Sequence, residues 1–211
     1  MICISIGKSE MIREINTLKP SLVEIRYDLM RQVPDEINEQ LNDSILQVAT
    51  CRPGIYTEQQ RIAVLKRAIE LGAVYVDIEV ESKAETIREI AAYAREKQTH
   101  VIISYHNFDS TPTLEELKSI LTSCYSAGGD VAKIACKVNS KNDSARLLSL
   151  YAEPGRKIVI GMGDAGKITR LAALELGAEF TFAAVSEAAA TAPGQQTYSE
   201  LLNMKKLLNR R

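Results

Sequence analysis

A regular alternation of short β-rich runs and helix-period segments is the feature that most constrains the fold of this 211-residue chain. Apolar and β-branched residues concentrate in eight runs, at 2–6, 22–28, 45–51, 74–80, 100–106, 131–138, 157–163 and 179–185. Because the strand-then-helix unit repeats at one scale without a break, it favours a closed (β/α)₈ TIM barrel, an α/β fold, over a doubly wound sheet. We therefore expect residues 1–211 to form a single barrel domain.

Helix start and stop signals support this alternation. Thr113 and Glu116 have the spacing of a capping box, and Gly128 is placed to end the helix that follows. Thr197 and Glu200 predict the same kind of start for the last helix. The helices are thus expected to fill the intervals between the strands.

Composition excludes several classes of function. With 26 basic and 27 acidic residues, the chain lacks the positive charge of a nucleic-acid-binding protein. Four cysteines without a C-x-x-C pair, together with two histidines, do not have the spacing of zinc ligands. No apolar run approaches the length of a membrane span, and the start lacks the order of a signal peptide, so we expect a cytoplasmic protein.

Strand parity predicts a charged barrel interior. In the second run Val23 and Ile25 form the apolar set that faces the helices, which leaves Glu24 and Arg26 pointing inward. The third run shows no clear alternation between residues that face inward and residues that face the helices. A packed interior would carry Val, Ile and Leu, so charges there indicate either an active site or a structural ion-pair network, for instance Glu24 with Arg26 or Arg52. Parity also turns inward a set from the later runs: Asp77, Glu79, Ser104, His106 and Lys133.

Lys133 and His106 are the inward residues with the most reactive side chains. A buried ammonium either pairs with an anion or gives up its proton, and the resulting amine forms Schiff bases with ketones. Alternatively, the stem of Lys133 is buried while its head reaches water. His106 ends its strand, where it is either a proton donor and acceptor near neutral pH or a satisfied strand-end residue.

Two loop segments allow alternative interpretations. GMGDAG at 161–166 matches a dinucleotide fingerprint, but no later sheet completes a nucleotide domain, so a tight turn explains its glycines more simply. A phosphate cradle is the other possibility, since barrels bind phosphate near strands seven and eight. The segment 186–197 is either a plain connection or a mobile lid.

Five motifs give the chain a family resemblance. VEIRYDL, ISYHNF followed by TP, AKIA, ITRLA with GAEFTFAAV, and TAPGQ occur in the order and approximate spacing of type I 3-dehydroquinate dehydratase. The resemblance extends over essentially the whole chain. It implies a homodimeric (β/α)₈ barrel that dehydrates 3-dehydroquinate to 3-dehydroshikimate in the shikimate pathway, without a metal or cofactor.

The resemblance also assigns roles to individual residues. Lys133 forms an imine with the ring ketone, and His106 removes a proton from the adjacent carbon and then protonates the leaving hydroxyl. Arg170 pairs with the substrate carboxylate, which a guanidinium can bind through two parallel hydrogen bonds. The remaining substrate-binding residues implied by the resemblance are Ser5, Glu24, Arg26, Arg52, Thr191 and Gln195.

The chain departs from the family pattern after Arg52. Relatives commonly carry Glu-Gly-Gly there, and its glutamate supports the catalytic histidine, whereas this chain reads CRPGIYTEQQR. Direct register places Tyr56 at the position of that glutamate, with Glu58 two residues on. Either Glu58 substitutes after a loop shift, or another group orients His106. A Schiff-base aldolase on the same barrel and a non-catalytic barrel are the alternative functions.

Overall fold

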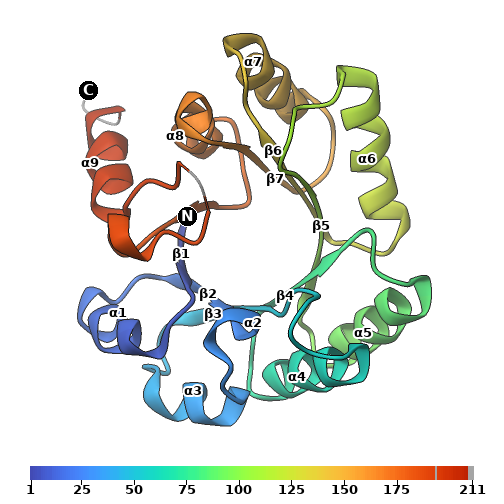
Figure 1. Cartoon of the computed structure of the whole chain (residues 1–211), viewed down its shortest axis with the longest axis vertical. Coiled ribbons are helices and arrows are strands. Elements are labelled where there is room, and N and C mark those ends of the chain that lie inside the picture. The colour runs from blue at the N-terminus through green and yellow to red at the C-terminus, as the bar shows by residue number, and fades with distance from the viewer. Residues whose placement is uncertain (193, 209–211) are drawn as a thin grey trace.

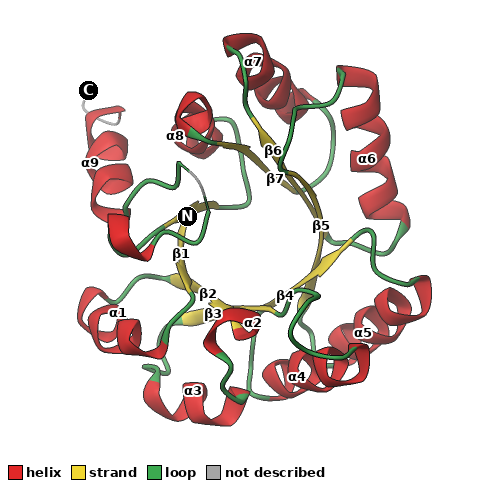
Figure 2. Cartoon of the chain, viewed as in Figure 1, coloured by secondary structure: helices red, strands yellow, loops and turns green. Residues whose placement is uncertain are grey.

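The computed structural model describes residues 1–192 and 194–208, and within them parallel strands form a ring surrounded by helices (Figure 1, Figure 2). This is the predicted single-domain barrel. Most of the strands begin and end within one or two residues of the runs expected from the sequence. They are β1 (Ile2–Ile6), β2 (Leu22–Arg26), β3 (Leu46–Thr50), β4 (Tyr75–Glu79), β5 (His100–Asn107), β6 (Val131–Lys137), β7 (Lys157–Met162) and β8 (Thr181–Ala183).

The strands follow one another around the ring in chain order. Neighbouring strands pair in parallel from β1 through β7, and β1 pairs with β8. Between β7 and β8 the backbone N–H of Glu179 donates to the carbonyl of Lys157 over 3.0 Å. The ring is therefore nearly closed, with all strand carboxyl ends at one mouth.

Helices cover the outside of the ring, and the capping signals operate as predicted. Thr113 and Glu116 form a reciprocal capping box, as do Thr57 and Gln60 at the start of α4. Thr197 and Glu200 exchange the same bonds at the last helix. The helices are α1 (Ile12–Leu18), α2 (Tyr27–Met30), α3 (Pro34–Gln40), α4 (Glu58–Glu70), α5 (Ala84–Glu96), α6 (Leu114–Ser126), α7 (Lys141–Ser149), α8 (Lys167–Glu175) and α9 (Tyr198–Leu208), with 3₁₀ turns η1 (Ser9–Met11), η2 (Leu150–Ala152), η3 (Asp164–Gly166) and η4 (Glu187–Ala189).

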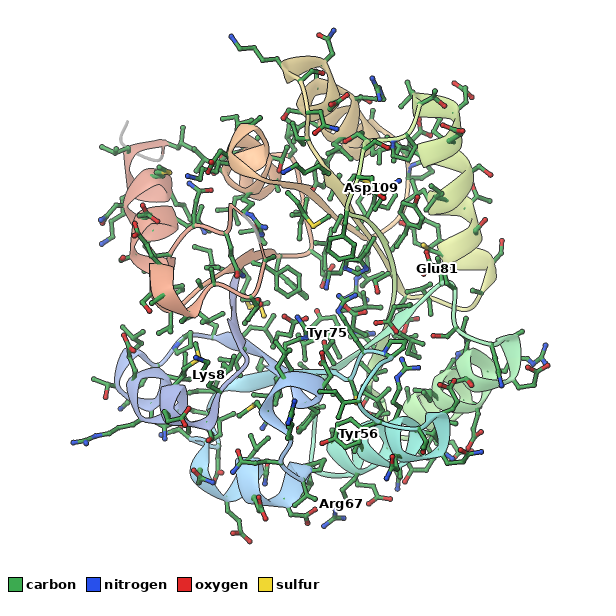
Figure 3. The ribbon with its side chains drawn as sticks, in the orientation of Figure 1. Lys8, Tyr56, Arg67, Tyr75, Glu81 and Asp109 are labelled. Carbon is green, nitrogen blue, oxygen red and sulfur yellow. The ribbon has the colours of Figure 1, made fainter. Side chains whose placement is uncertain are left out.

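Alternate residues of each strand belong to two different apolar layers. Val23 and Ile25 lie in the outer layer between strands and helices, as strand parity predicted. The interior differs from the prediction in one respect, because it also holds a packed apolar plug that extends up to the charged residues. Figure 3 shows Tyr75 of this plug inside the ring. The plug consists of Cys3, Leu22, Val48, Tyr75, Ile102, Val131, Ala135, Ile158, Ile160, Met162, Phe180 and Phe182.

The structure decides two expectations about the segments at the mouth of the barrel: where the second strand ends, and what the GMGDAG segment forms. The second strand is shorter than predicted, because Tyr27 begins the short helix α2. The glycines of GMGDAG form a tight turn, since a Cβ on Gly166 would lie 2.4 Å from the carbonyl carbon of Gly161, and Gly163 has φ of 84°. Within the described residues, the longest helices fall short of the apolar length that a membrane crossing needs.

Candidate active site

One cavity of about 140 Å³ opens at the carboxyl-terminal mouth of the ring. All nine residues predicted for the site line it, although they come from five strands or strand ends, from helix α8 and from the loop after β8. A larger hollow of about 800 Å³ lies outside this loop, over α9, and contains neither Lys133 nor His106. The smaller cavity therefore gathers the reactive side chains: Lys133, His106, Ser5, Glu24, Arg26, Arg52, Arg170, Thr191 and Gln195.

Lys133 lies on the cavity floor, only 4% exposed, and pairs with anions. Its Nζ donates to Asp77 Oδ2 over 2.7 Å and lies 3.7 Å from Glu24 Oε1. The ring of Phe182 packs against the same amine, with 4.3 Å between Nζ and the ring centroid. The ammonium is thus compensated inside the barrel, and its head does not reach bulk water.

Asp77 is the fixed counter-ion of this lysine. It is fully buried on β4, and its Oδ1 accepts a hydrogen bond of 2.6 Å from Ser104 on the neighbouring strand. Burial alone would raise the pKa of Asp77, but the positive charges of Lys133 and Arg52 outweigh it and hold that pKa below its usual value. Asp77 is therefore a carboxylate throughout the physiological range.

Glu24 stands on the other side of the amine. Its carboxylate accepts hydrogen bonds from Ser5 over 2.6 Å and from Thr50 over 3.0 Å. The structural ion pair expected with Arg26 or Arg52 does not form; within the described chain Glu24 pairs with Lys133, because the amine reaches between β2 and β4. Two carboxylates thus flank one reactive amine.

Arg52 holds the side chain of His106. Its NH1 and NH2 lie 3.0 Å from Nδ1 and 2.8 Å from Nε2 of the imidazole ring. A guanidinium only donates hydrogen bonds, so the contact favours the neutral ring, whose unprotonated nitrogen can accept. Burial, followed by the positive charges of Arg52 and Lys133, lowers the pKa of His106 well below its usual value. The ring is consequently an uncharged base at neutral pH.

Arg170 brings to the cavity wall a buried cation that has no anionic partner among the described residues. The residue is 1% exposed; its NH1 donates to the carbonyl of Phe182 over 3.2 Å, and its buried Nε has no hydrogen-bond partner within 1–192 and 194–208. Burial lowers the pKa of Arg170 to about 10. It is therefore not the solvated helix arginine that its sequence context would suggest, and it can bind an anion that enters the cavity.

The loop after β8 covers part of the cavity. Gln195 Oε1 accepts hydrogen bonds from the backbone N–H of Thr191 over 2.8 Å and from its hydroxyl over 3.1 Å. The loop packs tightly on the turn after β7, because a Cβ on Gly194 would lie 2.5 Å from the backbone of Gly163. Pro193 of the TAPGQ motif lies outside the described residues. The segment thus forms part of the cavity wall.

The question of the histidine's support has a structural answer. Tyr56 packs against the outer apolar layer, and Figure 3 shows it on the α4 side of the ring. Glu58 accepts hydrogen bonds from Arg61 over 2.9 Å and from Thr86 over 2.6 Å. In the part of the chain that the structure describes, the hydrogen-bond partner of His106 is Arg52, so neither candidate replaces the family glutamate by direct contact.

Comparison with known proteins decides the family. The family model for type I 3-dehydroquinase matches residues 2–211. The chain belongs to the type I 3-dehydroquinase family. Two relatives named 3-dehydroquinate dehydratase have sequences 34% and 37% identical to it. The first, from Desulfotalea psychrophila, aligns over 95% of this chain and 94% of its own length, and the second, from Methanococcus maripaludis strain C7, over 99% and 100%.

Solved structures agree with this type I 3-dehydroquinase assignment. The 3-dehydroquinate dehydratase of Aquifex aeolicus superposes with a TM-score of 0.87 at 30% identity and full coverage of both chains. The Clostridium difficile type I enzyme, solved with covalently modified comenic acid, gives 0.86 at 26% identity, covering 98% of this chain and 91% of its own. A 3-hexulose-6-phosphate synthase from Salmonella typhimurium, at 12% identity and a TM-score of 0.64 with 98% and 97% coverage, shares the fold alone.

Several residues of this type I 3-dehydroquinase cavity were missed by sequence reasoning. They are mainly apolar, and nothing in a β-rich run distinguishes a cavity wall from a packed core. Phe108 is the exception, because it is the last residue of the ISYHNF motif; it is exposed and stacks on His106 with 6.1 Å between ring centroids. The unpredicted lining residues are Phe108, Ala135, Ile160, Met162, Phe182 and Ala192.

Proposed function

We propose that the protein dehydrates 3-dehydroquinate to 3-dehydroshikimate and water, a step of the shikimate pathway, through an imine on Lys133. The observation that carries the proposal is one cavity that holds a buried amine, a neutral imidazole and an arginine with no counter-ion in the described part of the chain. Family membership supports the same reaction. Purified protein given 3-dehydroquinate should produce the ultraviolet absorbance of the conjugated enone. Persistent absence of that signal with folded protein would support the alternative of a non-catalytic barrel.

The first chemical step is imine formation on Lys133. The Lys133 ammonium, held by Asp77, loses a proton, and the free amine attacks the ring ketone. The ketone oxygen then leaves as water, which carries that proton and a second one from the nitrogen. The protonated imine draws electrons from the adjacent carbon, which makes its C–H bond acidic. The flanking carboxylates of Asp77 and Glu24 stabilise the positive charge that stays at the nitrogen.

The second step uses His106 twice. The neutral ring takes the proton from the carbon next to the imine, and the electron pair of the broken C–H bond forms an enamine. The enamine then expels the hydroxyl on the following carbon, and the imidazolium returns its proton to this leaving group as water. Hydrolysis of the imine releases the product and regenerates the amine. One histidine suffices because the proton it takes is the proton that the leaving group needs.

Arg170 gives a prediction with opposite effects on binding and stability. We expect Arg170→Met to raise KM about 10- to 100-fold, because hydrogen bonds to charged groups contribute about 1.5–3 kcal/mol. The thermal midpoint of the ligand-free protein should rise, since the substitution removes a buried charge without an anionic partner. Steady-state kinetics and calorimetry measure the two effects, and an unchanged KM would contradict the carboxylate-binding role.

The other polar residues of the cavity are proposed to bind the substrate's hydroxyl groups. Ser5, Glu24, Arg26 and Arg52 would form the floor, and Thr191 with Gln195 the cover. A homodimer in the cytoplasm is likewise a proposal.

A further inference from the structure

Arg61 of α4 is a buried arginine whose whole guanidinium group is occupied. Its side chain is 3% exposed. Its Nε donates to the carbonyl of Cys51 over 2.8 Å, its NH2 to Glu79 Oε2 over 2.9 Å and its NH1 to Glu58 Oε2 over 2.9 Å. Such a three-point arrangement fixes the planar group in one orientation.

Two of these contacts lead to Arg52. Cys51 directly precedes Arg52, so Arg61 holds the backbone from which the Arg52 side chain extends. Glu79 lies between the two guanidinium groups, with its Oε2 bonded to Arg61 and its Oε1 3.4 Å from Arg52 NH1. Arg52 in turn contacts both ring nitrogens of His106. A continuous series of charges thus connects α4 with the proposed base.

We propose that Arg61 is a positioning residue that fixes Arg52 against His106, through Glu79 and through the backbone of Cys51. The inference rests on the proposed function, in which His106 is the base. In this chain Tyr56 occupies the position of the family glutamate that supports the histidine. Arg61, acting through Arg52, would supply that support instead.

The charge of Glu79 explains why Arg61 is needed. Burial and the neighbouring carboxylate of Asp77 raise the pKa of Glu79, while the two arginines oppose this rise. Without Arg61 the Glu79 carboxyl gains a proton more readily, and Arg52 loses its anionic neighbour. A long arginine side chain without that neighbour populates other rotamers and leaves the imidazole unsupported.

The start of α4 fixes Arg61 itself. The capping box of Thr57 and Gln60 sets the first turn of the helix. Glu58, one turn before Arg61, accepts from Thr86 on α5 as well as from Arg61. Glu58 is therefore separated from Arg52 by Arg61 and Glu79, and it holds Arg61 without contacting His106 directly.

The two histidines of the sequence allow a test that does not depend on turnover. In ligand-free protein, NMR titration of the ring signals should show the His106 midpoint moving upward in Arg61→Gln, because a loosened Arg52 no longer opposes protonation. His100, at the other end of β5, is the internal reference. Arg67→Gln is the matched control, since Arg67 lies on the same helix in exposed ion pairs at the molecule's outer edge (Figure 3).

The other charged groups around His106 are the same in Arg61→Gln and Arg67→Gln, so they do not affect the comparison of the two His106 midpoints. A double-mutant cycle then separates positioning from general structural damage. If Arg61 acts through Arg52, Arg61→Gln should have no further effect on the His106 midpoint in an Arg52→Gln background. Additive shifts would overturn the proposal. The charged groups that face the ring are Arg26 of β2, Arg52 after β3, Asp77 of β4 and Lys133 of β6, with Glu79 behind Arg52.

Kinetics complete the test. Relative to active wild-type protein, Arg61→Gln should lower kcat about 10- to 100-fold, since a small misplacement of a catalytic group costs about this much. Arg61→Lys keeps a charge beside Glu79 and should recover part of the rate; it also serves if Arg61→Gln does not fold. Unchanged kcat and midpoint in these variants would overturn the positioning role. Inactive wild-type protein would instead contradict the proposed function.

Discussion

Lys133→Met should lower turnover at least about 10⁴-fold, because losing a covalent nucleophile removes the reaction path itself. The proposed mechanism has no second amine to replace it: within the described residues, Lys133 is the lysine that lines the cavity. Steady-state ultraviolet assays at high enzyme concentration measure the loss. Residual turnover above one percent of wild type would contradict an obligatory imine.

Loss of activity must be separated from loss of structure. Lys133→Met leaves Asp77 as a buried, unpaired carboxylate, which costs about 3–5 kcal/mol of stability. The double variant Lys133→Met/Asp77→Asn should recover stability without recovering turnover. Lys157→Met is the matched control, because Lys157 is an equally buried lysine at the opposite end of the barrel, bonded to the carbonyls of Glu153 and Gly155. Its folded fraction should retain full activity.

His106→Ala should lower turnover about 10²- to 10⁴-fold, the usual contribution of general acid–base catalysis. Imine formation should persist, because Lys133 and its two carboxylate neighbours are unchanged. The prediction therefore separates imine formation from the proton transfer that follows it. Borohydride reduction in the presence of 3-dehydroquinate should still modify the variant, while the product's absorbance is nearly lost.

The second histidine is the control for this substitution. His100 lies at the amino-terminal end of β5, half exposed and away from the cavity, so His100→Ala should turn over substrate like the wild type. Unchanged turnover in His106→Ala would exclude His106 as the base. Loss of imine trapping in that variant would show that His106 also serves the first step.

The sequence could predict the barrel and its charged mouth because both depend on local periodicity. Alternation in β2 and β6 placed Glu24 and Lys133 on the inner face before any contact was known. The family motifs then supplied roles for His106 and Arg170. Both residues lie in short, specific sequence motifs. The residues assigned from these motifs and from strand parity, nine in all, line one cavity in the structure.

Partners across the barrel could not be predicted in the same way. The pair between Lys133 and Asp77 joins residues 56 apart, and its geometry depends on strand tilt and side-chain length. Arg61 carried no signal, because a buried arginine on a helix has the same local pattern as a solvated one. The apolar plug of the interior was missed for a related reason, since parity specifies a face of the strand and not which side chains on that face pack together.

The central claim is that Lys133 forms an imine with the substrate. Its most direct test is intact-mass and peptide analysis after borohydride reduction in the presence of 3-dehydroquinate. One stable adduct per chain is expected, located on Lys133 and absent from Lys133→Met. Unmodified protein, or an adduct on another lysine, would contradict it.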